Sequence, residues 1–160
     1  MEQISEHITY KEAVFSDTAL RKGIDNTPSE TQLRNMQILA ECVFEPLRAA
    51  LGNRSIYISS FFRSPQLNHA LSTKASKNSQ HMANNGAAMD LDNDRIITGP
   101  TNREIFDYIL NNLIFDQLIL EFPDQNENPS WVHVSYNIDN NRMQVLKSIR
   151  VNGKVKYIEY

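Results

Sequence analysis

Residues 79–91 read Ser79-Gln80-His81-Met82-Ala83-Asn84-Asn85-Gly86-Ala87-Ala88-Met89-Asp90-Leu91. The last five of them are apolar except for Asp90, and a short apolar run of this kind is typical of a buried strand. The stretch therefore predicts a strand that presents Asp90, preceded by a loop that carries His81.

A second stretch with a histidine reads Trp131-Val132-His133-Val134-Ser135 and alternates as a strand does, with its two valines facing the core. A catalytic zinc ion needs three nitrogen or oxygen ligands and one open position for water. The candidate ligand set is His81, Asp90 and His133. Small residues at 86–88 would let the chain run close beside such an ion. The residues alone leave a second interpretation open, in which both histidines are ordinary core or surface residues.

Capping residues and apolar spacing predict two longer helices. The first is expected from Thr27, its N-cap, to Gly52-Asn53, with Pro28 at its first position and a bend at Pro46. The second is expected over Thr101 to Asn112, capped by Thr101. The inward faces of the two helices are expected to comprise Leu33, Met36, Leu39, Val43, Leu47, Ala50, Ile105, Phe106, Tyr108 and Ile109.

The remaining elements are strands and short helices. The predicted strands are residues 55–59, 87–91, 115–122 and 131–136, the last two joined by the turn-rich loop 123–129. Short helices are expected after Thr9 and over 65–71. Asn152-Gly153 predicts a turn that joins 143–149 and 154–160 as a hairpin, or else a helix end followed by a strand. This order predicts an α+β fold, with helices packed on a small, mainly antiparallel sheet.

Length and composition indicate one globular domain over residues 1–160, with 41% hydrophobic and 22% charged residues. A net charge of -3 argues against nucleic acid as a partner, because nucleic-acid-binding domains usually carry a basic stripe. We expect no membrane span and no export signal at the N-terminus. The single cysteine, Cys42, excludes an internal disulfide and is expected to be buried. His7 and His69 lack neighbours typical of a site.

Five motifs follow one another along the chain: Ser59-Ser60-Phe61-Phe62-Arg63-Ser64-Pro65, Leu67-Asn68, Ser79-Gln80-His81, Gly86-Ala87-Ala88-Met89-Asp90 and Trp131-Val132-His133-Val134-Ser135. Together they resemble the zinc D-Ala-D-Ala carboxypeptidase family, which includes phage endolysins of the L-alanyl-D-glutamate peptidase type and has the hedgehog/DD-peptidase fold. Residues 23–29 are similar to short phage and prophage members, so the resemblance covers about residues 9–136.

The resemblance implies a zinc-dependent peptidase that cuts bacterial cell-wall peptidoglycan, at the terminal D-Ala-D-Ala bond or within the stem or crossbridge. It assigns the zinc ligands as His81, Asp90 and His133, and Arg63 as the arginine that holds substrate near the metal. A guanidinium suits this role because its rigid fork of donors fits a carboxylate or a developing oxyanion. Ser79-Gln80 are implied to contact substrate beside the metal.

Two departures from the family concern the mouth of the site. Four residues, 82–85, separate His81 from the next glycine where relatives usually have two. Ser72-Thr73 stand where a glycine pair is common. We expect a reshaped loop and a changed substrate preference rather than loss of the metal.

A third departure concerns the general base. Many relatives carry an acid three residues before the second histidine, where this chain has Ser130. We expect Glu121 to serve instead, because it ends the strand expected beside His133 and short relatives have a similar glutamate. Asp124 and Glu127 are the alternatives. The rival hypothesis is a zinc-containing, catalytically silent wall- or protein-binding module.

Overall fold

The computed structural model of the chain describes residues 2–71 and 76–160, so the expectation for Ser72-Thr73 lies outside the described residues. The helices are α1 (Tyr10–Val14), α2 (Asp17–Lys22), α3 (Glu30–Leu39), the π-helix η1 (Ala40–Phe44), α4 (Glu45–Ala50), α5 (Pro65–Leu71), the 3-10 helix η2 (Gln80–Met82) and α6 (Asn102–Asn112). The strands are β1 (Gln3–Ser5), β2 (Ile8–Thr9), β3 (Ile58–Ser60), β4 (Ala87–Leu91), β5 (Gln117–Glu121), β6 (Trp131–Tyr136), β7 (Gln144–Val151) and β8 (Lys154–Glu159). None of the described helices is long and apolar enough to cross a membrane.

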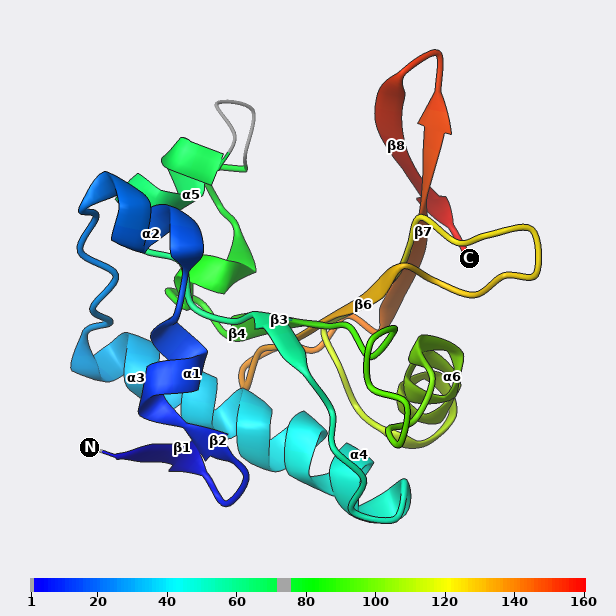
Figure 1. Cartoon of the computed structure of the whole chain (residues 1–160), viewed down its shortest axis with the longest axis horizontal. Helices are drawn as coiled ribbons and strands as arrows, with labels where there is room; N and C mark the ends of the chain where they lie inside the picture. Colours follow the sequence, from blue (N-terminus) through cyan, green and yellow to red (C-terminus); the bar gives the residue numbers. More distant parts are fainter. Residues whose placement is uncertain (1, 72–75) are drawn as a thin grey trace.

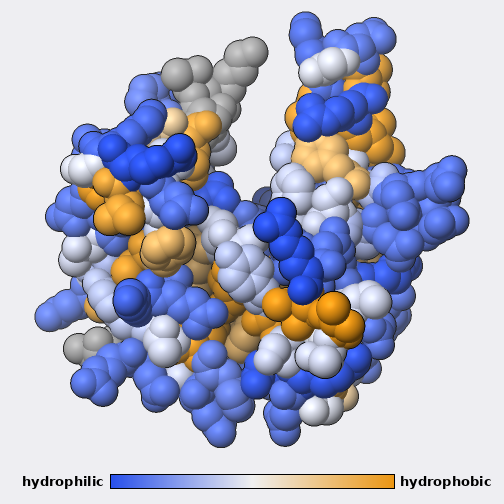
Figure 2. Space-filling view, in the orientation of Figure 1, coloured by the Kyte–Doolittle hydropathy of each residue, from blue (hydrophilic) through white to orange (hydrophobic). Residues whose placement is uncertain are grey.

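Six strands form one sheet in the order β3-β4-β6-β5-β7-β8, and β1 pairs with β2 separately. All neighbours in the larger sheet are antiparallel except β5 and β7, which are parallel. Figure 1 shows α3, α4 and α6 below the central strands, while α5 and the β7–β8 hairpin rise above them. The surface is hollowed between the α5 region and the hairpin (Figure 2). The predicted α+β fold with a mainly antiparallel sheet is confirmed.

The two faces of the sheet differ in environment. Residues opposite each other in register point to the same face, so Asp90, His133 and Ile119 lie side by side on β4, β6 and β5. The alternate residues of these strands are fully buried against the helices: Met89, Leu91, Leu118, Leu120, Val132 and Val134. From the helices they meet Met36, Leu39, Leu47, Ile105, Phe106 and Ile109. The core thus occupies one face and leaves the Asp90 face open.

Helix α3 begins two residues later than predicted. Its N-cap is Ser29, which forms a capping box with Gln32, whereas the backbone N–H of Thr27 donates to Asp25 in a preceding turn. Both Thr27 and Ser29 fit the capping pattern, but the Gln32 amide also donates to the carbonyl of Met82, 50 residues away. This tertiary contact favours the second start, which local sequence does not reveal.

The predicted bend at Pro46 takes the form of a π-helix, η1, directly before α4. Proline has no N–H to donate to the carbonyl four residues earlier, and its ring crowds that carbonyl. A wider turn relieves the crowding, and the N–H of Glu45 donates to Ala40 instead. Cys42 lies on this segment and is exposed, so the expectation that it is buried was wrong. Ala50 is likewise exposed rather than inward-facing.

Most predicted strands are confirmed with shifted ends. The strand expected at 55–59 is β3, because the side chain of Asn93 binds the backbone at Ser55 and Tyr57 and holds the earlier residues out of the sheet. β5 and β6 form the expected pair around loop 123–129. The C-terminus is a hairpin, since Asn152-Gly153 adopts the positive φ angles of the predicted turn. The alternative of a helix end there was wrong.

Candidate metal centre

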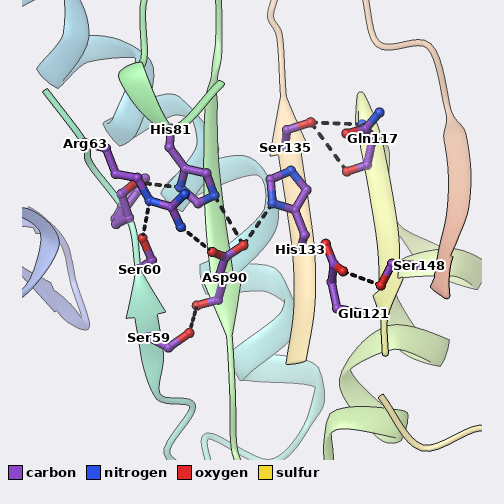
Figure 3. A network of polar contacts seen from close by, with 11 residues as sticks. Ser59, Ser60, Arg63, His81, Asp90, Gln117, Glu121, His133, Ser135 and Ser148 are labelled. Atoms are coloured by element: carbon purple, nitrogen blue, oxygen red, sulfur yellow. Dashed lines mark hydrogen bonds and ion pairs between the residues drawn. The ribbon is translucent and has the colours of Figure 1, made fainter. Parts of the chain in front are cut away.

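Three side chains from three segments converge on the open face of the sheet (Figure 3). His81 lies on η2, Asp90 on β4 and His133 on β6. The Oδ1 atom of Asp90 lies 2.9 Å from Nδ1 of His133 and 3.3 Å from Nε2 of His81. One ligand atom from each residue lies within 4.8 Å of the others. The structure therefore brings together the three residues predicted as metal ligands.

His81 is oriented by the backbone around it. Its Nδ1 lies 2.8 Å from the carbonyl oxygen of Phe61. A carbonyl can only accept, so Nδ1 carries the proton and Nε2 is left with its lone pair toward Asp90. The N–H of Arg63 donates to the His81 carbonyl at 2.9 Å and ties η2 to the β3–α5 connection. Metal-binding histidines usually have such an outer partner for the second ring nitrogen.

The geometry and protonation of the three residues fit a zinc ion. Bonds of about 2.0–2.1 Å at tetrahedral angles would place ligand atoms about 3.3 Å apart, close to the 2.9 and 3.3 Å found. Burial lowers the pKa of His81, which keeps its imidazole neutral. Burial works in the opposite sense on Asp90, but His81 and His133 hold the pKa of this carboxyl well below its usual range. Neutral imidazole and ionised carboxylate are the metal-binding forms.

Arg63 lies beside this centre, as predicted. Its Nη2 donates to Oδ2 of Asp90 at 2.7 Å, and its Nε donates to Oγ of Ser60 at 2.9 Å. Among the described residues, its Nη1 has no hydrogen-bond acceptor. The guanidinium is thus fixed in position with donors left for a ligand in the pocket.

Asn26, which sequence reasoning did not single out, holds the backbone on both sides of Arg63. Its Oδ1 accepts from the N–H of Ser64 at 2.6 Å, and its Nδ2 donates to the carbonyls of Phe62 and Val14. The signal for it was the resemblance of residues 23–29 to phage and prophage members. The N-terminal third of the chain therefore helps to position an arginine of the site.

Besides the candidate ligand Asp90, Glu121 is the acid among the described residues that lines the pocket. It ends β5 opposite Trp131, and it lines the same pocket of about 570 Å³ as the three candidate ligands. Burial raises the pKa of the Glu121 carboxyl, although the Ser148 hydroxyl, which donates to its Oε2, acts in the opposite sense. The N–H of Ser130 donates to the Glu121 carbonyl at 2.8 Å. Glu121 thus neighbours the position where relatives carry their acid.

The two alternative acids lie in the loop 123–129, outside the pocket lining. Asp124 accepts hydrogen bonds from the backbone N–H groups of Asn126 and Asn128. Glu127 forms an ion pair with Lys147. Both carboxylates are therefore engaged in organising the loop.

Ser79 and Gln80 line the pocket next to His81. The Gln80 amide donates to Oδ2 of Asp116 at 2.8 Å, and Asp116 in turn accepts from Nε and Nη2 of Arg142, both at 2.7 Å. Burial opposes the effect, but Arg142 holds the pKa of Asp116 below its usual value. This chain of contacts orients Gln80. The sequence carried no signal for Asp116 or Arg142.

Three other expectations have clear outcomes. His7 pairs with Glu45 at 2.7 Å, and His69 is exposed on α5; neither lines the pocket. Gly86, one of the small residues expected to let the chain run beside an ion, makes room for another strand. A Cβ there would collide with the carbonyl oxygen of Tyr136, and its φ is 82°, so the glycine allows the end of β6 to approach.

A family model described as Peptidase M15 matches residues 6–135. The chain belongs to the peptidase M15 family. No curated protein matches the chain.

Membership of the M15 family confirms the resemblance to zinc D-Ala-D-Ala carboxypeptidases, and M15 peptidases are in general zinc-dependent. The matched residues contain the three candidate ligands, Arg63 and Glu121. The pocket nevertheless extends beyond the M15 match, because Arg142, Leu146 and Tyr157 also line it.

Proposed function

We propose that this protein is a zinc-dependent M15 peptidase that hydrolyses a peptide bond of bacterial peptidoglycan, at the terminal D-Ala-D-Ala bond or within the stem or crossbridge. In this proposal residues 1–160 act as one peptidase domain. The observation that carries it is the convergence of His81, Asp90 and His133 in one pocket with Glu121 and Arg63, in a member of the M15 family.

The three convergent residues would hold the zinc ion, which supplies Lewis-acid chemistry by polarising a carbonyl group and lowering the pKa of water. Glu121 accepts a proton from the attacking water at its carboxylate and returns it to the leaving amine. Its raised pKa suits this double role, because a group that acts first as a base and then as an acid works best when its pKa lies near the operating pH. Arg63 donates to the substrate oxygen that becomes negative, or to a terminal carboxylate.

Product analysis tests the proposal directly. Zinc-loaded protein is incubated with purified peptidoglycan fragments, and the products are identified by mass spectrometry. We expect fragments that differ from the substrate by one added water and expose one new amino group at a single kind of peptide bond. A sample treated with a chelator is the control and should give none. Intact fragments after incubation with zinc-loaded protein would contradict the proposal.

A catalytically silent binding module is the second candidate, and Ser130 is the observation that favours it, because many relatives carry an acid there. The same samples separate the two functions. Fragments that bind to the zinc-loaded protein, and stay uncut, would identify the binding module.

The pH dependence of turnover should report the ionisation of the Glu121 carboxyl. Burial raises its pKa, and a general base acts only as the carboxylate, so kcat/KM should fall as the pH drops through a value above the ~4.3 of an unperturbed glutamate. Burial lowers the pKa of His81, which keeps this candidate ligand in its metal-binding form across this limb of the profile. Turnover and zinc content are measured in the same samples. An activity loss that appears only together with zinc release would contradict the assignment.

A further inference from the structure

One wall of the pocket that holds the candidate metal centre is formed by residues beyond the part of the chain that the M15 family model matches. Leu146 on β7 and Tyr157 on β8 line it together with Glu121, Trp131 and His133. The M15 match ends at residue 135. The β7–β8 hairpin is therefore an addition to the matched part of the chain, and it reaches the site.

Strand register places Tyr157 on the face that carries the site. Tyr157 lies opposite Ser148 on β7, and the Ser148 hydroxyl donates to Glu121 on β5. Leu146, two residues before Ser148, lies on that face too and is opposite Ile119. In Figure 2 the hairpin forms one side of the hollow, and the α5 region forms the other.

Contacts near the base and near the turn of the hairpin join it to the body of the protein. Nη2 of Arg103 on α6 donates to the Tyr160 hydroxyl at 3.0 Å, and the rings of Phe106 and Tyr160 meet edge to face with centroids 5.1 Å apart. The guanidinium of Arg150 lies over the ring of Phe122, 4.6 Å from its centroid. These contacts hold the hairpin against the body of the protein, so its side chains can present a surface to a ligand.

The Tyr157 hydroxyl is available as a donor. Among the described residues none accepts a hydrogen bond from it, and 54% of the residue is solvent-accessible. Burial of the remainder, together with the carboxylates of Glu121 and Asp90, raises the pKa of Tyr157, so the phenol stays protonated at neutral pH. A protonated phenol and the aliphatic side chain of Leu146 in one pocket suit a peptide, because they offer a donor for a carbonyl and apolar surface for a side chain.

Strand spacing gives the length of peptide that this wall can contact. His133 on β6 and Tyr157 on β8 are three strand steps apart, roughly 14 Å at about 4.8 Å per step. An extended peptide advances about 3.3 Å per residue, so this gap corresponds to about four residues. A peptide that runs along the sheet from the metal centre to β8 is therefore several residues long.

We infer that the β7–β8 hairpin is a substrate-binding wall, in which Tyr157 and Leu146 contact a cell-wall peptide several residues away from the bond that is cut. The inference rests on the proposed function and narrows its substrate class to extended peptides. Tyr157 acts here as a specificity-determining residue, separate from the chemistry at zinc.

The test combines two protein variants with two substrate lengths. Tyr157→Ala removes the contact, and Ile158→Ala is the matched control, since it removes an exposed apolar side chain from the opposite face of the same strand. Both fragments contain the bond identified by product analysis; the short one is trimmed to one residue on each side. Zinc content and unfolding temperature are measured for each variant.

Wild type and Ile158→Ala should favour the longer fragment by about tenfold or more in kcat/KM, mainly through KM, as one well-formed contact would give. Tyr157→Ala should lose most of this preference. The dissociation constant for the longer fragment, measured in a Glu121→Gln background in which cutting is slow, should rise by a similar factor. If Tyr157→Ala retains zinc and its length preference and dissociation constant are unchanged, the inference is overturned while the proposed function still stands. If wild type cuts neither fragment, the proposed function fails as well.

Discussion

His81→Ala and His133→Ala should each reduce the zinc content from about one ion per chain to near zero, and turnover should fall to background with it. Either change leaves two of the three convergent side chains, and two ligands make a poor zinc site. The measurement is elemental analysis of purified, dialysed protein, with turnover recorded on the same samples.

The matched control for these variants is His69→Ala, because His69 is exposed on α5 and outside the pocket. It should keep the zinc content and activity of wild type. Asp90 is a buried carboxylate, and loss of a histidine beside it also removes a stabilising partner, so the unfolding temperature should fall in both ligand variants. His133→Gln keeps a side chain of similar length and separates this packing effect from metal binding. Full zinc retention in the His81 and His133 variants would rule out the assignment.

Glu121→Gln should lower turnover by a factor on the order of 10² to 10⁴ while zinc content stays near that of wild type. Glutamine keeps the shape of the side chain and an oxygen that can accept from Ser148, but it cannot accept the proton of the attacking water. Steady-state kinetics on the peptidoglycan fragments, with zinc analysis, provides the measurement.

Folding of this variant should not suffer. Burial raises the folded-state pKa of Glu121, so above that pKa the charged carboxylate lowers the stability of the folded state. An uncharged amide does not have this destabilising effect. The Tm of Glu121→Gln at neutral pH should therefore be no lower than that of wild type. Asp124→Asn and Glu127→Gln are the controls and should keep most of the activity, because both acids lie outside the pocket. Retention of more than about a tenth of wild-type turnover by Glu121→Gln would show that another residue is the base.

The residues that converge at the candidate metal centre could be found from the sequence because each lies in a short, continuous motif. His81 and Asp90 occur within one stretch of 13 residues, and His133 stands on a strand with an alternating pattern. Helix α6 was also predicted with its cap, since Thr101 and Glu104 form a capping box without a competing alternative nearby. Local chemistry was enough for the helix cap, whereas the choice of His81, Asp90 and His133 as ligands over ordinary core or surface residues rested on the resemblance to the family.

Other features depend on contacts between distant segments, which no local sequence pattern reveals. The start of α3 at Ser29 depends on the contact between Gln32 and Met82. The position of Tyr157 depends on the parallel pairing of β7 with β5, which decides the face that its side chain joins. On an exposed strand, a tyrosine that turns toward a pocket and one that turns toward solvent look alike in sequence.

The order of strands in the sheet also bears on how this protein can evolve. The candidate ligand strands β4 and β6 are interior, and their other face is packed with fully buried side chains, so few substitutions there preserve the fold. Every residue of β8 is exposed at the edge of the sheet, so its side chains can be exchanged without disturbing the core. Selection can therefore act on the proposed substrate-binding wall separately from the candidate metal centre. A combinatorial library confined to residues 154–159 should contain mostly folded members and vary chiefly in the peptides that they accept.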